Sequence, residues 1–176
     1  MNTSLSALVV MGVSGCGKSS VGAAIVGRSG GRLIEGDSFH PEANIAKMRA
    51  GTPLDDDDRA GWLKRLGEEM TACVKAGERP VLTCSALKLK YRETLRGAVP
   101  GLGFVFLELN RADAADRVAH RPGHFMPASL IDSQFATLEP PTGERLTLPL
   151  DATQPIVKLA QQVEDWLIEH GASTLA

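Results

Sequence analysis

The chain is poor in aromatic residues and carries almost no net charge. Phenylalanine, tryptophan and tyrosine make up 5% of its 176 residues, and the formal net charge is −2 at pH 7. A charge excess that would draw the whole molecule to nucleic acid or to an anionic membrane is therefore missing. The contents of 43% hydrophobic and 23% charged residues are ordinary for a globular protein. We expect a single domain over residues 1–176 with a sizeable core and no nucleic-acid partner.

Cysteine is scarce, and long apolar runs are missing. Cys16, Cys73 and Cys84 are odd in number and lack the spacing of metal ligands, which argues against a disulfide framework and favours a reducing compartment. No apolar run approaches the roughly 20 residues that a membrane-spanning helix needs. The apolar stretch near the N-terminus has no basic region before it of the kind that targeting signals carry. We therefore expect a cytoplasmic protein without a membrane partner.

What the sequence does contain is a glycine-rich motif at residues 12–19, Gly-Val-Ser-Gly-Cys-Gly-Lys-Ser, with the spacing G-x-x-x-x-G-K-[ST]. Glycines let consecutive backbone N–H groups face phosphate oxygens, the lysine reaches the β- and γ-phosphates, and the final hydroxyl ligates Mg²⁺. An apolar run of strand length precedes the motif and a helical pattern follows it, which is an anion-binding arrangement. The sequence thus predicts a nucleoside triphosphate site with Lys18 as a catalytic residue and Ser19 as the metal ligand. The predicted cofactor contacts in this loop are Gly12, Ser14, Gly15, Cys16, Gly17, Lys18, Ser19 and Ser20.

Strand-like and helical segments alternate along the whole chain. The expected strands cover 5–11, 32–35, 80–84, 103–109 and 146–150. The expected helices cover 19–28, 42–50, 57–76, 88–96, 113–120, 129–138 and 155–169. This alternation predicts an α/β fold whose five-stranded parallel sheet is covered by helices on both faces.

Ligands of such sheets bind beyond the carboxyl ends of the strands, so the residues just after each strand are candidate functional residues. Asp37 follows the second strand, where a carboxylate can orient an acceptor hydroxyl and take its proton during phosphoryl transfer. A plain turn or capping role is the alternative for Asp37. His40, just before Pro41, is equally consistent with a ligand contact and with a turn histidine.

Four consecutive aspartates at 55–58 are open to two interpretations. They could bind Mg²⁺, but carboxylates at a helix N-terminus are also what the helix dipole favours, and we favour the capping interpretation. Arg59 follows them and offers a guanidinium fork that matches a substrate carboxylate. Trp62 and Leu66 lie one helical step apart and are expected in the core or at a dimer surface rather than at a ligand.

Lys88 and Arg92 follow the third strand and are i, i+4 neighbours, so both charges are expected on one helical face. That face points either to an anionic substrate or to solvent. Arg117 and Arg121 have the same spacing after the fourth strand. Arginines there can stack on adenine or neutralise charge on the transferred group, and the second role would make Arg121 catalytic.

Two further segments complete the candidate site. Residues 121–127 and 139–143 are rich in proline and glycine and flank a short helix, which predicts a movable lid over about 121–143. After the last strand, Thr153 and Pro155 belong either to a loop around adenine or to a plain strand-to-helix turn.

These residues resemble the gluconokinase family, small P-loop kinases that phosphorylate D-gluconate at its 6-hydroxyl. The resemblance runs from residue 8 to about 155. Beyond the glycine-rich loop it rests on 35–37, 40–41, 44, 47–48, 51, 53–54, 56, 58–59, 62–63, 84–88, 91–92, 124–126, 133–135 and 137–139.

The resemblance implies a nucleoside-monophosphate-kinase-like P-loop fold with a mobile lid. It also implies ATP and Mg²⁺ as cofactors, a homodimer, and 6-phosphogluconate as the product. Lys18 and Ser19 would then serve the phosphates and the metal, and Asp37 the acceptor hydroxyl. The candidate contacts to the hydroxyls and the carboxylate of gluconate are Asp37, His40, Arg59, Lys88, Arg92 and His124.

Two other functions fit parts of the sequence. The fold alone also permits shikimate or a nucleoside monophosphate as the phosphoryl acceptor, although the block Cys-Ser-Ala-Leu-Lys at 84–88 argues against both. A nucleotide-dependent switch of the GTPase kind would need an Asn-Lys-x-Asp stretch and an Asp-x-x-Gly directly after a strand, and we find neither.

Overall fold

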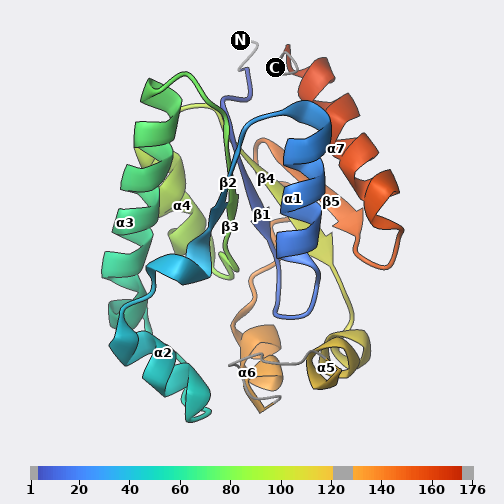
Figure 1. Ribbon diagram of the computed structural model, residues 1–176. Coiled ribbons are helices and arrows are strands. Elements are labelled where there is room, and N and C mark those ends of the chain that lie inside the picture. Colours follow the sequence, from blue (N-terminus) through green and yellow to red (C-terminus); the bar gives the residue numbers. More distant parts are fainter. Residues whose placement is uncertain (1–3, 121–128, 172–176) are drawn as a thin grey trace.

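A five-stranded parallel sheet forms the centre of the molecule (Figure 1). The computed structural model describes residues 4–120 and 129–171. The strands are β1 (Ala7–Met11), β2 (Arg32–Glu35), β3 (Pro80–Thr83), β4 (Leu102–Glu108) and β5 (Thr147–Asp151). They lie in the order β2-β3-β1-β4-β5, and every neighbouring pair is parallel. The predicted fold class is confirmed, and the strand ends differ from the predicted ones by one or two residues at most.

Helices cover both faces of this sheet. They are α1 (Lys18–Ser29), α2 (Glu42–Arg49), α3 (Asp56–Lys75), α4 (Leu89–Ala98), α5 (Arg111–Ala119), α6 (Ser129–Thr137) and α7 (Ile156–Glu169). In Figure 1, α3 and α4 lie on one face and α1 and α7 on the other. Within the described part of the chain, no helix is both long and apolar enough to cross a membrane.

Strand β1 shows why the sheet is buried on both sides. All five of its residues are buried, and side chains along a strand point alternately to opposite faces. Leu8 and Val10 join the core on the α1 and α7 side. Ala7, Val9 and Met11 join the core on the α3 and α4 side. A continuous apolar run is therefore what this strand requires, as in other parallel sheets.

The aspartate run at 55–58 caps α3, as the capping interpretation predicts. The Asp55 carboxylate accepts a hydrogen bond from the backbone N–H of Asp58 at 2.8 Å, and the Asp58 carboxylate accepts one from the N–H of Asp55 at 3.0 Å. This reciprocal pair is a capping box. Among the described residues, no group of three or more acidic, histidine or cysteine side chains is arranged to hold a metal ion.

A short element between β2 and α2 is absent from the sequence-based prediction. The chain leaves β2 through the 3₁₀ helix η1 (Gly36–Phe39). A side chain at Gly36 would collide with the carbonyl oxygen of Thr83, so only glycine lets β2 pass this close to β3 as it turns. The turn leaves Asp37 at the carboxyl edge of the sheet, where α2, α5 and α6 also lie (Figure 1).

Candidate active site

The glycine-rich loop joins β1 to α1 in a conformation that needs glycine. Gly12 has a φ of 145°, and a Cβ there would lie 2.8 Å from Cys16 Sγ and 2.9 Å from the carbonyl oxygen of Leu107. The loop ends at Gly17, which is the N-cap of α1 and has no side chain to cap it. The N–H groups of the first helical turn and the helix dipole therefore favour an anion at this point.

Lys18 and Ser19 occupy the end of the loop. The Lys18 ammonium donates to the carbonyl oxygens of Gly12 and Val13 at 3.0 and 3.1 Å, so its charge lies against the loop itself. The Ser19 hydroxyl donates to Glu35 Oε2 at 2.9 Å.

Glu35 is a site residue that the sequence-based prediction does not include. Its Oε2 atom also accepts a hydrogen bond from Thr83 Oγ1 at 2.7 Å. Glu35 is the last residue of β2 and Thr83 the last of β3, and β3 separates β2 from β1. The signal available in the sequence was an acidic residue at the end of a strand, two positions before Asp37.

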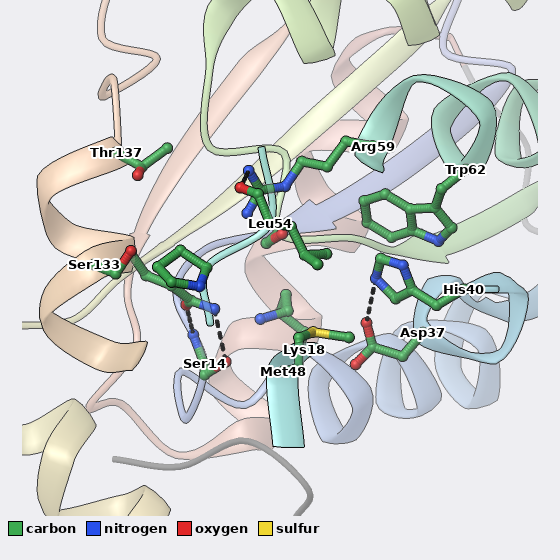
Figure 2. A pocket seen from close by; sticks show the side chains of 13 residues that line it. Ser14, Lys18, Asp37, His40, Met48, Leu54, Arg59, Trp62, Ser133 and Thr137 are labelled. Carbon is green, nitrogen blue, oxygen red and sulfur yellow. Dashed lines mark hydrogen bonds and ion pairs between the residues drawn. The ribbon is translucent and has the colours of Figure 1, made fainter. Parts of the chain in front are cut away.

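Two of the predicted substrate contacts, Asp37 and His40, lie next to each other in the structure. Figure 2 shows their side chains facing each other, with His40 Nε2 3.7 Å from Asp37 Oδ1. The His40 ring stacks on Trp62, with centroids 3.9 Å apart and planes inclined by 16°. The Asp37 side chain is 65% exposed, whereas that of His40 is only 3% exposed. Trp62 is thus buried as predicted, but it also supports a site residue.

Burial determines the charge state of His40. It lowers the pKa of the imidazole from 6.5 to about 4, against the opposing effect of the Asp37 carboxylate and with a smaller contribution from the Arg59 guanidinium. His40 is therefore neutral at pH 7.

A cavity with about 580 Å³ of empty space, including its open mouth, lies beside these residues. It is lined by Ser14, Lys18, Asp37, His40, Met48, Pro53, Leu54, Arg59, Trp62, Ser85, Ser133, Gln134 and Thr137. These residues come from the glycine-rich loop, η1, the α2–α3 region, the end of β3 and α6 (Figure 2). Among the predicted substrate contacts, Asp37, His40 and Arg59 line this cavity.

Arg59 is anchored at one end of its guanidinium. Nη1 donates to the carbonyl oxygen of Leu54 at 2.6 Å and to the Tyr91 hydroxyl at 3.2 Å, and the guanidinium lies 5.3 Å from the centre of the Tyr91 ring. Within residues 4–120 and 129–171, Nε and Nη2 have no hydrogen-bond acceptor. The anchored group can thus offer its remaining donors to a carboxylate in the cavity.

Lys88 and Arg92 do not line this cavity. Lys88 is the N-cap residue of α4, and its ammonium lies 3.1 Å from Asp56 Oδ1. Hydrogen bonds to Asp56 from Lys90, Tyr91 and Lys88 hold the pKa of that carboxyl far below its usual range. Lys88 is therefore paired with a carboxylate that stays ionised.

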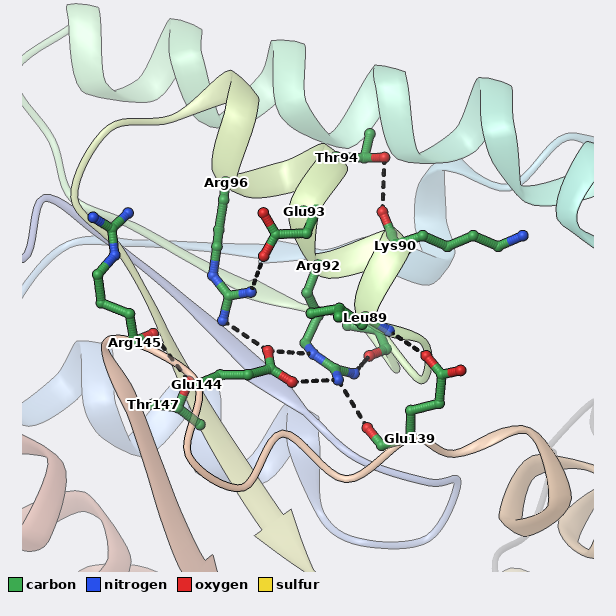
Figure 3. Close-up of polar contacts among 11 residues, drawn as sticks. Leu89, Lys90, Arg92, Glu93, Thr94, Arg96, Glu139, Glu144, Arg145 and Thr147 are labelled. Carbon is green, nitrogen blue, oxygen red and sulfur yellow. Dashed lines mark hydrogen bonds and ion pairs between the residues drawn. The ribbon is translucent and has the colours of Figure 1, made fainter.

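Arg92 is fully buried, and its guanidinium is engaged by protein groups (Figure 3). It donates to both carboxylate oxygens of Glu144 at 3.0 and 2.7 Å, and to the carbonyl oxygens of Ala86 and Glu139 at 2.7 and 2.8 Å. The prediction that Arg92 and Lys88 present their charges together to an anionic substrate does not fit this arrangement. A buried arginine cannot be distinguished from an exposed one by i, i+4 spacing alone.

Helix α6 contacts the glycine-rich loop through Gln134, which the sequence-based prediction also missed. Gln134 Oε1 accepts a hydrogen bond from the backbone N–H of Ser14 at 2.6 Å, and Nε2 donates to the Ser14 hydroxyl at 3.1 Å. Both residues are buried. A residue about 120 positions away thus fixes the loop, and no local pattern marks such a contact.

A second hollow, with about 760 Å³ of empty space including its open mouth, lies on the other side of the glycine-rich loop. Arg117 crosses its edge and donates to the carbonyl oxygens of Gly15 and Cys16 at 3.3 and 3.4 Å and of Ala152 at 3.2 Å. The residues that line this second hollow are Gly15, Cys16, Gly17, Ser19, Ser20, Val21, Arg117, Ala152, Gln154, Ile156 and Leu159. Five of the predicted cofactor residues of the loop therefore gather here with Arg117, whereas Ser14 and Lys18 line the first cavity.

Thr153 and Pro155 lie next to this hollow rather than in its lining. The backbone N–H and the hydroxyl of Thr153 both donate to Asp151 Oδ1, at 2.9 and 2.6 Å. Pro155 is the N-cap residue of α7, whereas Ala152, Gln154 and Ile156 provide the lining. The predicted residues Arg121 and His124 lie outside the described part of the chain.

No family model matches the chain, but individual proteins do. It is 52% identical over 134 residues to a gluconokinase of Gluconobacter oxydans, covering 76% of this chain and 75% of that protein. It is 37% identical over 155 residues to a thermosensitive gluconokinase of Escherichia coli, covering 88% and 83%. A solved gluconokinase structure from Sinorhizobium meliloti has a TM-score of 0.79 at 46% identity, covering 93% of this chain and 96% of that one. A solved sugar kinase structure from a Janibacter species has a TM-score of 0.89 at 41% identity, covering 97% and 99%.

Proposed function

The chain belongs to the gluconokinase family, and from this premise we propose that it transfers the γ-phosphoryl group of ATP to the 6-hydroxyl of D-gluconate. The products are 6-phospho-D-gluconate and ADP. The observation that carries this proposal is the cavity beside the glycine-rich loop, which gathers Lys18, Asp37 and Arg59 from three separate segments.

Each of these three side chains has a chemical role in the proposed reaction. Asp37 orients the acceptor hydroxyl and takes its proton as the new bond to phosphorus forms. Lys18 neutralises charge on the β- and γ-phosphates. Arg59 binds the gluconate carboxylate with the donors that Leu54 and Tyr91 leave available. The residues that line the second hollow, with Arg117 at its edge, would hold the nucleotide of ATP.

Mg²⁺ fits this site through Ser19. This ion is usually held by one or two protein oxygens together with phosphates and water, so a dedicated cluster of carboxylates is not required. The Ser19 hydroxyl donates a hydrogen bond to Glu35. The lone pairs of the Ser19 oxygen therefore remain available for a cation. When bound, the ion would neutralise negative charge on the β- and γ-phosphates.

Other features of the proposal rest on the sequence analysis and on the family resemblance. They are a homodimer, a cytoplasmic location, and a lid over about 121–143 in which Arg121 neutralises the transferred group and His124 contacts gluconate. The docking of α6 on the glycine-rich loop through Gln134 is in keeping with a lid that follows the state of the nucleotide site.

A coupled assay for ADP release tests the proposal. We expect ATP consumption to be stimulated by gluconate, and not by shikimate or by nucleoside monophosphates. The variant Asp37→Asn should keep its affinity for ATP and lose about 10²–10⁴-fold in turnover, the usual contribution of a general base. Stimulation by another acceptor but not by gluconate would overturn the substrate, and an unchanged rate in Asp37→Asn would overturn the role of Asp37.

A further inference from the structure

Asn44 determines which nitrogen of His40 carries the proton. The Asn44 Nδ2 atom lies 2.9 Å from the carbonyl oxygen of Asp58, which can only accept a hydrogen bond. The same Nδ2 lies 3.2 Å from His40 Nδ1. An amide nitrogen carries two hydrogens, so Asn44 can donate one hydrogen bond to the carbonyl oxygen of Asp58 and the other to Nδ1 of His40. His40 Nδ1 must then be the acceptor, and the neutral ring carries its proton on Nε2.

The Nε2–H of His40 faces the Asp37 carboxylate. The Nε2 to Oδ1 distance is 3.7 Å, longer than a hydrogen bond, and such contacts are often long before the substrate is bound. The ring itself has little freedom, because it stacks on Trp62 and its side chain is 3% exposed. Trp62 is held in turn by a hydrogen bond from Nε1 to the carbonyl oxygen of Gly36 at 2.8 Å.

We propose, building on the function proposed above, that His40 is a positioning residue for Asp37 and not a contact to the substrate. Its Nε2–H donates to Asp37 Oδ1 in the substrate complex, which leaves Oδ2 for the proton of the acceptor hydroxyl. Both ring nitrogens are then used by protein groups, and one ring face is covered by Trp62. The ring orients the carboxylate without adding a positive charge that would weaken it as a base.

The first experiment compares His40→Phe with His40→Gln. Phenylalanine keeps the stacking on Trp62 but has no donor, and glutamine is long enough to place an N–H near the position of Nε2. We expect His40→Phe to lower kcat about 10²-fold, the cost of a misplaced catalytic group, with little change in the KM for gluconate. His40→Gln should recover most of that loss.

The matched control is His170→Phe, since His170 also lies against a tryptophan, Trp166, but at the end of α7. It should leave kcat and KM unchanged. A rise in the KM for gluconate with kcat unchanged in His40→Phe would show that His40 binds the substrate and overturn the proposal. So would equal losses of kcat in His40→Phe and His40→Gln when thermal unfolding shows both to be folded.

A second experiment uses the ¹⁵N NMR signals of labelled histidine, which do not depend on activity. The chain has four histidines, and the signals missing from His40→Gln identify those of His40. We expect the Nε2–H tautomer in the wild-type protein and protonation of Nδ1 in Asn44→Asp, because a carboxylate accepts where the amide donates. Asn44→Asp should also lose kcat.

The two experiments separate this proposal from the proposed function. A wild-type protein whose ATP consumption is not stimulated by gluconate would contradict the proposed function. The tautomer of His40 could still be determined by NMR in that case. An Nδ1–H tautomer in the wild-type protein, or a changed tautomer in Asn44→Asp with full kcat, would contradict the role of His40 alone.

Discussion

Arg59 and Arg92 show how the surroundings of a residue decide what it does. Arg59 is held by Leu54 and Tyr91 through one nitrogen and lines the cavity. Arg92 is fully buried, and Glu144 receives two of its hydrogen bonds. The sequence suggests both arginines as contacts to an anionic substrate, but only Arg59 lies where it can make such a contact. An arginine side chain can always donate hydrogen bonds, but the acceptors around it decide whether those donors are already used or remain available to a ligand.

The lowered pKa of His40 predicts a dependence of stability on pH. The imidazole has its ordinary pKa of 6.5 in the unfolded chain and a pKa of about 4 in the folded one. Between these values the unfolded chain binds a proton that the native protein does not, so stability falls as the pH falls through this window. The contribution is about 2 kcal/mol between pH 7 and pH 5.

Urea unfolding of the wild-type protein and of His40→Phe at pH 7 and pH 5 measures this contribution. The wild-type free energy of unfolding should drop by about 2 kcal/mol more than that of the variant. The lowered pKa values of Asp58 and Glu144 act at lower pH, because stability from those groups is lost as the pH falls through their folded values. The same drop in both proteins would show that His40 does not titrate in this way.

At the scale of elements, single local features set where site residues lie. The capping box at Asp55 and Asp58 starts α3 about one turn before Arg59 and two turns before Trp62. The 3₁₀ helix η1 turns Asp37 toward the cavity immediately after β2. The ion pair of Arg92 with Glu144 joins α4 to the segment before β5. The first two features place site residues, whereas the ion pair fixes α4 against the segment before β5 and brings no residue into the cavity.

The ion pair between α4 and the segment before β5 predicts that removing one member lowers the free energy of unfolding more than removing both. Glu144→Leu leaves the fully buried Arg92 guanidinium without its carboxylate partner, which should lower the free energy of unfolding by about 3 kcal/mol. Replacing both members, with Arg92→Met added, removes the unpaired charge and should recover part of that loss. Urea unfolding at pH 7 measures all three proteins. A double variant less stable than Glu144→Leu would contradict this account of the pair.

At the scale of the whole molecule, the glycine-rich loop stands between two hollows. One is lined by Asp37, His40 and Arg59, and the other by Arg117 and the start of α7. Helices α5 and α6 both contact the loop, through Arg117 and Gln134. This arrangement fits the proposed function, in which one hollow is the acceptor side and the other the nucleotide side.

The two sides predict two separable kinetic defects. Arg59→Ala should raise the KM for gluconate by about 10- to 100-fold, the value of a hydrogen bond to a charged group, and leave the KM for ATP nearly unchanged. Arg117→Ala should do the reverse. Steady-state kinetics with each substrate varied in turn measures both. If either variant raised both KM values equally, the proposed division of the site would be wrong.

The strands and the α-helices, to within two residues at each end, the glycine-rich loop between β1 and α1, and the position of Asp37 after β2 could be predicted from the sequence. These features depend on residues that are close along the chain, such as the glycines at 12, 15 and 17 and the apolar run of β1. Glu35, Asn44 and Gln134 could not be assigned roles in this way. Their partners are Ser19, His40 with Asp58, and Ser14, and only the path of the folded chain brings these groups within hydrogen-bond distance.

The sequence by itself therefore predicted the fold class and the glycine-rich loop, because periodicity and local spacing encode both. The family was indicated by the resemblance of motifs that are spread along the chain. The tertiary structure alone decided which charged side chains reach the cavity. Arg92 and Arg59 look alike in the sequence, but burial beside Glu144 satisfies one guanidinium, while the other keeps donors to offer. The tautomer of His40 was decided in the same way, since it depends on an amide and a carbonyl that α2 and α3 bring together.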